Sequence, residues 1–220
     1  AEELGLDKTI TNEIASDLAN RVNSDTSDEN KFMDLVKAAG EDNNAKLVAA
    51  YLKSQGFEAN YVNPGEAGLL LSDEFGNAHV LSESYDNLPT LRDIPGIIVS
   101  PGFFGYTKNG EVVTFSRGGS DITGSILAAA VEADLYENFT DVDSVYSVNP
   151  NLVDNPRPIK ELTYREMREL SYSGFSVFHE EALEPVYHRG IPVRIKNTNN
   201  PDAPGTTIRK NRSEINDPVV

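Results

Sequence analysis

Two segments carry most of the information about this chain: SPGFFG at residues 100–105 and SRGGSD at residues 116–121. A short β-like run at 97–99 precedes the first segment. The dipeptide Asn-Gly at 109–110, between Tyr106 and Val112-Val113, predicts a β-hairpin between the two segments. The second segment opens a helix that we expect over about 120–132. A strand, two glycine-rich turns and a helix N-terminus therefore follow one another closely.

The SRGGSD segment has the chemistry of an anion site. Glycines allow close approach of the backbone, and the first turn of a helix presents free N–H groups at the positive end of its dipole. Arg117 adds a planar guanidinium that can bind a carboxylate through two hydrogen bonds, and Asp121 can bind Mg²⁺ or orient a lysine. An ordinary glycine turn capped by Ser120 or Asp121 has the same spacing, so the residues alone leave both interpretations open.

The composition fits one soluble domain and argues against several classes of partner. Hydrophobic residues make up 39% of the 220 residues, which is enough for a core, and the formal net charge is −16. That charge repels phosphate backbones and anionic lipids, so we expect neither nucleic acid nor a membrane as a partner. Cysteine is absent, which excludes disulfides and thiolate chemistry. With no apolar run of membrane-spanning length and no signal peptide, we expect a cytoplasmic protein.

The rest of the chain alternates between helix and strand patterns. Apolar residues at four-residue intervals predict a helix over about 6–18, and two further helices are expected on either side of Gly40-Glu41. Thr163 and Glu166 form a capping-box pattern that opens another helix. The alternation predicts an α/β fold in layers around a largely parallel sheet. Short β-like runs are expected at residues 57–62, 69–71, 97–99, 135–139, 191–195 and 206–208.

Several segments occur in an order that is typical of one enzyme family. The segment 101–123 ends in FSRGGSDIT and is the most specific of them. Gly40-Glu41 lies upstream of it. The segments downstream are FTDVDSVY (139–146), NP (149–150), 159–171, FSVFH (175–179), IPVRIKNT (191–198) and PGT (204–206). In this order they resemble the aspartate kinases of the amino-acid kinase family, and the resemblance covers about residues 40–208.

The resemblance implies a role for each of a set of residues. Those that would surround the substrate aspartate are Glu41, Phe103, Arg117, Gly118, Gly119 and Ser120. Among these, Arg117 and Ser120 would bind carboxylates and Glu41 the α-ammonium group. Asp121 would be the catalytic residue, organising a lysine. Those that would line the nucleotide site are Thr140, Asp141, Tyr146, Asn151, Ser176 and Val177. Many relatives have a basic residue in place of Asn151 and a lysine in place of Ser176.

Each assignment has a structural alternative that the residues alone do not exclude. Glu41 can be a carboxylate that complements a helix dipole, Thr140-Asp141 a turn that ends a strand, and Tyr146 a packing aromatic. The three histidines show no metal-ligand spacing, and we expect no metal site built from protein side chains alone.

The fold implied by the resemblance is a three-layer α/β/α sandwich of the amino-acid kinase type. We expect residues 1–208 to be a partial catalytic domain and 209–220 a polar linker. Nothing before Glu41 matches the Lys-Phe-Gly-Gly-Ser-type start of the family, which supplies the catalytic lysine. We therefore expect the domain to be incomplete at its N-terminus and this chain alone to be inactive.

The activity implied is transfer of the γ-phosphoryl group of ATP, bound with Mg²⁺, to the β-carboxylate of L-aspartate. In the family this reaction is the first step of lysine, threonine and methionine biosynthesis, and the full-length protein is expected to be a homo-oligomer. Two alternatives stay open. One is a sister kinase that acts on glutamate or acetylglutamate, and the other is a non-catalytic module that binds a small molecule.

Overall fold

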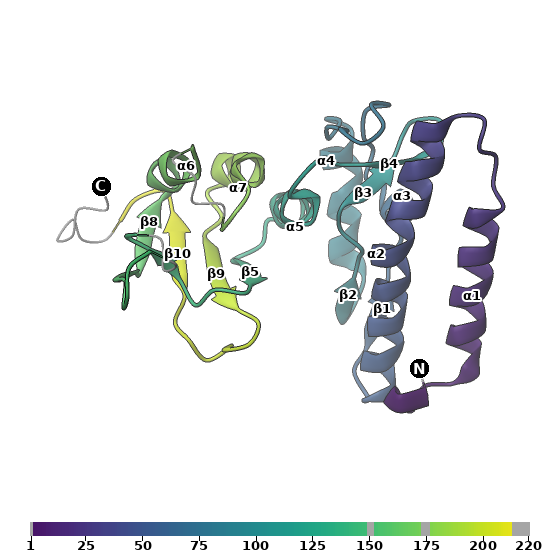
Figure 1. Cartoon of the computed structure of the whole chain (residues 1–220), viewed down its shortest axis with the longest axis horizontal. Coiled ribbons are helices and arrows are strands. Elements are labelled where there is room, and N and C mark those ends of the chain that lie inside the picture. The colour runs from purple at the N-terminus through teal and green to yellow at the C-terminus, as the bar shows by residue number, and fades with distance from the viewer. Residues whose placement is uncertain (1, 149–151, 173–176, 213–220) are drawn as a thin grey trace. The chain divides into compact units, whose positions relative to one another are not determined.

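The computed structural model describes residues 2–148, 152–172 and 177–212 (Figure 1). The chain divides into two compact units, Ala1–Ser120 and Asp121–Val220, and each is described by itself. The fold class is α/β, as expected. In the described residues, no helix combines the length and the apolar character that crossing a membrane requires.

The N-terminal unit combines a long helical hairpin with two small sheets. Strands β1 and β2 pair in parallel, and β3 and β4 pair antiparallel around the Asn109-Gly110 turn, which confirms the predicted β-hairpin. Helix α2 packs against α1 and against β1, β2 and β4, as Figure 1 shows. The elements are η1 (Glu2–Leu4), α1 (Lys8–Val22), α2 (Glu29–Ser54), β1 (Ala59–Tyr61), α3 (Pro64–Ala67), α4 (Ser84–Asn87), η2 (Leu88–Asp93), β2 (Ile97–Val99), β3 (Phe104–Tyr106) and β4 (Val112–Thr114).

Helix α2 corrects one expectation from the sequence. Gly40-Glu41 does not separate two helices, because α2 runs without interruption from Glu29 to Ser54. A glycine inside a helix costs about 1 kcal/mol relative to alanine. Gly40 is exposed, with open space around its Cα, while the alanines on the opposite face are buried against the sheets. Packing along that face outweighs the local preference of a single glycine.

The C-terminal unit contains a four-stranded sheet in the order β5-β9-β10-β8. Strands β5 and β9 are parallel, as are β8 and β10, but β9 and β10 are antiparallel, so the sheet is mixed rather than largely parallel. The elements are α5 (Gly119–Ala130), β5 (Tyr136–Thr140), β6 (Val145–Tyr146), β7 (Pro158–Ile159), β8 (Glu161–Thr163), α6 (Tyr164–Tyr172), η3 (Glu180–Ala182), α7 (Leu183–Arg189), β9 (Val193–Asn197) and β10 (Thr206–Arg209).

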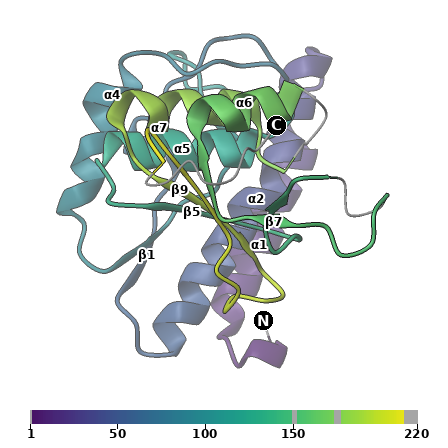
Figure 2. The same ribbon diagram turned by 90° about the vertical axis from the view of Figure 1, so that its left-hand side faces the viewer.

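Helices α6 and α7 lie over one face of this sheet (Figures 1 and 2). The buried side chains between them are large and apolar, and include Leu162, Met167, Val186, Val193 and Ile195. The start of α6 has the predicted capping box. The Glu166 carboxylate accepts from the Thr163 N–H at 2.8 Å, and the Thr163 hydroxyl accepts from the Glu166 N–H at 3.2 Å.

Candidate functional site

The two glycine-rich segments that precede α5 pack against each other backbone to backbone. A Cβ added at Gly102 would lie 3.1 Å from Cα of Ser120. A Cβ added at Gly119 would lie 2.9 Å from Cδ2 of Phe103. Neither position can therefore take a side chain unless its neighbour shifts. The structure brings Phe103, Gly119 and Ser120 into direct proximity, although the sequence separates them widely.

The backbone at this junction adopts two left-handed conformations. Gly118 has φ +76°, which glycine tolerates without cost, and Phe103 also has φ +76°. For a residue with a Cβ that conformation costs about 1–2 kcal/mol. The Phe103 carbonyl accepts a hydrogen bond from the Phe115 N–H at 3.0 Å, which helps to hold the strained residue in place. Strain of this kind persists where the surrounding structure requires one particular geometry.

The exposed side of the junction has the groups that an anionic ligand needs. Arg117 and Ser120 are both exposed, and α5 begins at Gly119, with Asp121 in its first turn. The first N–H groups of a helix and a guanidinium together favour carboxylate or phosphate.

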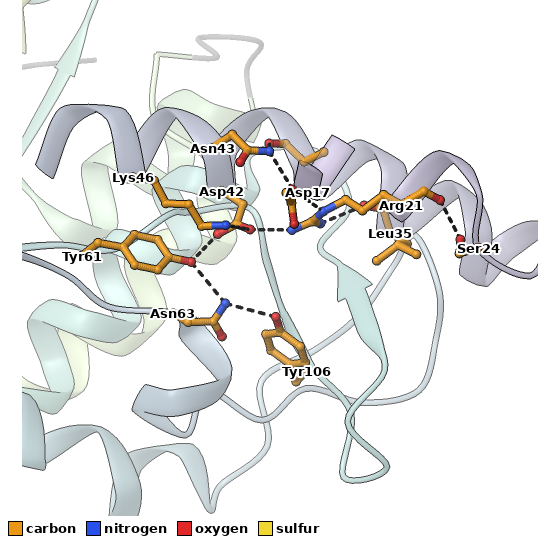
Figure 3. A network of polar contacts seen from close by, with 11 residues as sticks. Asp17, Arg21, Ser24, Leu35, Asp42, Asn43, Lys46, Tyr61, Asn63 and Tyr106 are labelled. Carbon is orange, nitrogen blue, oxygen red and sulfur yellow. Dashed lines mark hydrogen bonds and ion pairs between the residues drawn. The ribbon is translucent and has the colours of Figure 1, made fainter. Parts of the chain in front are cut away.

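Glu41 is exposed on α2, and its neighbour Asp42 is buried at the centre of a polar network (Figure 3). Arg21 of α1 and Tyr61 of β1 both donate hydrogen bonds to the Asp42 carboxylate, and Lys46 lies 3.3 Å from it. Burial, reinforced by the hydrogen bond to Asp42, raises the pKa of Tyr61 above its ordinary value. Two cationic side chains thus compensate a carboxylate that is almost fully removed from water.

The network continues from β1 to β3. The side-chain amide of Asn63 donates to the hydroxyl oxygens of Tyr61 and Tyr106, at 3.2 Å each. At the other end, Arg21 also binds Asp17 at 2.8 Å. The network therefore fixes α2, which carries Glu41, to α1, β1 and β3. Strand β3 begins directly after Phe103.

A second buried carboxylate ties α2 to β4. Asp34 is 1% exposed, and its Oδ2 accepts from the N–H groups of Gly76 at 2.7 Å and Thr114 at 2.8 Å. Its Oδ1 accepts from the Thr114 hydroxyl at 2.9 Å. Three donors satisfy this carboxylate, and β4 leads directly from Thr114 towards Arg117. Asp34 and Asp42 look like surface charges in the sequence, and no local pattern distinguishes them.

The structure describes four of the six residues predicted to line the nucleotide site, and two of them, Thr140 and Asp141, are adjacent at the end of β5. Thr140 ends β5, with Asp141 exposed after it, beside Asn197 at the end of the parallel strand β9. Tyr146 lies in β6, and Val177 is half-buried. Asn151 and Ser176 lie outside the described residues. Asp143 was not among the predicted residues, and its Oδ1 accepts from the side-chain amides of Asn197 at 2.7 Å and Asn200 at 3.3 Å.

Asp121 has two partners that the sequence did not reveal. Asn138, 8% exposed on β5, donates from Nδ2 to Asp121 Oδ1 at 2.8 Å. The Tyr136 hydroxyl donates to the Asp121 carbonyl oxygen at 3.2 Å. The pKa of Tyr136 is raised to about 12. Burial is the main cause, the Asp121 charge also raises the pKa, and the hydrogen bond from Asn138 partly opposes them. An asparagine inside a short strand was the available signal, because asparagine is depleted there.

Two further features bear on the site. A groove of about 530 Å³ lies along α6, η3 and α7, and none of the predicted site residues lines it. In the part of the chain that the structure describes, no group of three or more His, Cys, Asp or Glu side chains could hold a metal ion.

Comparisons with known proteins agree with this geometry. The chain is 60% identical, over all of its 220 residues, to aspartokinase 3 of Bacillus subtilis (strain 168), of which it spans 48%. Its structure matches E. coli aspartokinase III in complex with aspartate and ADP with a TM-score of 0.79 at 27% identity, covering 94% of this chain and 46% of that one. The aspartate kinase of Clostridium acetobutylicum matches with a TM-score of 0.70 at 40% identity, covering 82% and 39%.

The chain spans less than half of the length of each of these proteins. The model of the amino acid kinase family matches residues 2–197, which is most of the chain. With its α/β elements, its glycine-rich junction at α5 and this match, the chain belongs to the amino acid kinase family.

Proposed function

We propose that this chain is part of the catalytic region of an aspartate kinase. The observation that carries the proposal is the interlocked junction at the start of α5. There Phe103, Gly118, Gly119 and Ser120 form a fixed backbone surface beside the exposed guanidinium of Arg117. A rigid backbone with N–H donors and one guanidinium suits a small dicarboxylate better than a large or apolar substrate.

Each acceptor-side residue has a physically matched role. Arg117 and Ser120 would bind the carboxylates of aspartate, and Glu41, exposed on α2, would bind its ammonium group. Asp121 would orient a lysine that contacts the transferring phosphoryl group. The 60% identity to aspartokinase 3 supports aspartate as the acceptor, as does the aspartate bound in the E. coli structure named above.

The second substrate would be ATP. Thr140 and Asp141 offer a hydroxyl and an exposed carboxylate where two parallel strands end, which is where α/β sheets usually bind ligands. Tyr146 and Val177 would complete the described part of this site, and Asn151 and Ser176, which lie outside the described residues, would also belong to it. Oxygen ligands suit Mg²⁺, which we expect to be bound mainly by nucleotide phosphates and water. The ion would neutralise phosphate charge.

The reaction would need no covalent enzyme intermediate. A β-carboxylate oxygen of aspartate would form a bond to the γ-phosphorus, and the bond from that phosphorus to the β,γ-bridging oxygen would break, giving aspartyl phosphate and ADP. The protein would contribute positioning of the two reactants and fixed positive charge.

The test is ADP release by the full-length protein with aspartate, glutamate, acetylglutamate or no acceptor. We expect turnover that depends on aspartate. A strong preference for glutamate or acetylglutamate would assign the chain to a sister kinase. Nucleotide binding without turnover on any acceptor would favour a non-catalytic binding module. The control is Arg165→Ala, an exposed arginine on α6 that should leave the acceptor preference unchanged.

A further inference from the structure

The strand that leads to the nucleotide residues has an inverted hydrophobic pattern. On β5, the polar Asn138 is 8% exposed, whereas the apolar Phe139 next to it is 50% exposed. Pairing with β9 sets this register, since Asn138 lies opposite Ile195 and Phe139 opposite Lys196. A buried amide with nothing to bind would cost about 1–3 kcal/mol. The inward position of Asn138 therefore requires a compensating partner.

That partner is Asp121, at the start of α5. Asn138 Nδ2 donates to Asp121 Oδ1 at 2.8 Å and to the Tyr136 hydroxyl oxygen at 3.1 Å. The Tyr136 hydroxyl in turn donates to the Asp121 carbonyl oxygen at 3.2 Å. Both the side chain and the backbone of Asp121 are thus tied to β5. The hydrogen bond from Asn138 occupies only the Oδ1 atom of Asp121, so the Oδ2 atom of Asp121 can accept from a second donor.

A glycine makes this arrangement possible. A Cβ at Gly124, one helical turn after Asp121, would lie 2.5 Å from the Tyr136 hydroxyl oxygen and 2.8 Å from Cζ of that ring. No side chain fits there while Tyr136 reaches the Asp121 carbonyl. Gly124 lies inside α5, where glycine costs about 1 kcal/mol relative to alanine. The close approach of Tyr136 accounts for a residue that lowers the stability of its helix.

We infer that Asn138 and Tyr136 are positioning residues that hold the Asp121 carboxylate in its orientation for phosphoryl transfer, and that Gly124 admits Tyr136 to this role. The inference rests on the proposed function, because Asp121 acts in catalysis only if the chain is a kinase. A hydrogen bond to Oδ1 restricts rotation of the Asp121 carboxylate, so the direction in which Oδ2 points is also set. That direction would determine the position of the group that Oδ2 binds. Loss of such a support typically costs about 10- to 100-fold in activity.

The decisive variant is Asn138→Leu. Leucine is branched at Cγ as asparagine is, although it is larger, and it cannot donate a hydrogen bond to Asp121. We expect the 220-residue chain to stay folded, with a loss of stability of the size that a larger buried side chain causes. In the full-length protein we expect kcat to fall at least tenfold, with little change in the KM for aspartate. A purely structural role predicts instead that kcat is unchanged in the folded enzyme.

Two further arms test whether the effect passes through Asp121. Tyr136→Phe should lower kcat by a smaller factor, whereas Tyr164→Phe, which loses a buried hydroxyl bonded to the Ile191 carbonyl, should not lower it. Asp121→Asn should itself lower kcat strongly, and adding Asn138→Leu to it should then change kcat little.

The outcomes separate the inference from the proposed function. Wild-type protein without aspartate-dependent turnover overturns both. An active wild type in which Asn138→Leu keeps full kcat overturns the inference alone, and so does full additivity of Asn138→Leu with Asp121→Asn. A selective loss of kcat that disappears in the Asp121→Asn background supports it.

Discussion

The buried carboxylate of Asp34 should contribute strongly to the stability of the N-terminal unit. It accepts three hydrogen bonds, two from backbone N–H groups and one from the Thr114 hydroxyl. Hydrogen bonds to a charged acceptor contribute about 1 kcal/mol more than neutral ones. Asp34→Asn keeps the shape but removes the charge, and an amide is easier to desolvate. We therefore expect a net loss of about 2 kcal/mol.

Asp34→Ala should be worse. It leaves the N–H groups of Gly76 and Thr114 without their acceptor, at about 1–3 kcal/mol each, so we expect a loss of about 4 kcal/mol. For a chain of this size, Asp34→Asn should lower Tm by about 4–8 °C.

The assay is unfolding of the 220-residue chain by urea, followed by circular dichroism, with hydrogen exchange of the α2 and β4 amides. Hydrogen exchange is needed because two compact units need not unfold together. Asp86→Asn, on the exposed surface of α4, is the control and should change stability by less than about 0.5 kcal/mol. Equal stability and equal amide protection of wild type and Asp34→Asn would refute the reasoning, as would additivity of Asp34→Asn with Thr114→Val.

Three other predictions concern the proposed activity and the buried hydroxyl of Tyr136. In the full-length protein, Arg117→Ala should lower kcat/KM for aspartate by roughly 100-fold with little change in ATP affinity, and unchanged aspartate kinetics would remove Arg117 from the site. N-acetylaspartate should be a much poorer acceptor than aspartate, because acylation removes the charge that Glu41 would bind; similar rates would contradict the role of Glu41. The pKa of Tyr136 is about 12 in the folded chain against about 10 when unfolded, so its contribution is full below pH 10 and is lost as the pH rises from 10 to 12. That contribution is at most about 2.7 kcal/mol, and the stability of Tyr136→Phe, measured by urea unfolding, should fall less steeply over this pH range than that of the wild type.

The sequence predicted those elements whose signals are local. The Asn109-Gly110 hairpin and the Thr163–Glu166 capping box follow from side chains that act on their own neighbouring backbone, and both are confirmed. The break at Gly40 was wrong, because the packing of a whole helix face decides whether a helix continues through one glycine.

The supporting residues of the candidate site could not be predicted in the same way. Asp34 and Asp42 resemble solvated charges on a charged helix, and only partners far along the chain reveal that they are buried. Asn138 is similar, since the alternation on β5 suggests that Phe139 points inward. Motifs indicate the residues that would contact a ligand, whereas the partners of the residues behind them depend on tertiary contacts that local sequence patterns do not show.

The continuity of α2 limits which changes in length the protein can accept. Asp34 is bound to β4 and the turn at Gly76, and Asp42 to α1 and β1, all through one unbroken helix. Each residue of a helix advances by about 100°, so one residue inserted or deleted between the two aspartates would turn one of them away from its partners. A change of about seven residues, two full turns, would restore both directions but move the two aspartates by about 10 Å relative to each other along the helix axis. We therefore expect related sequences to differ in this segment by substitutions and not by insertions or deletions, because a change in length would alter the directions in which the two aspartates point.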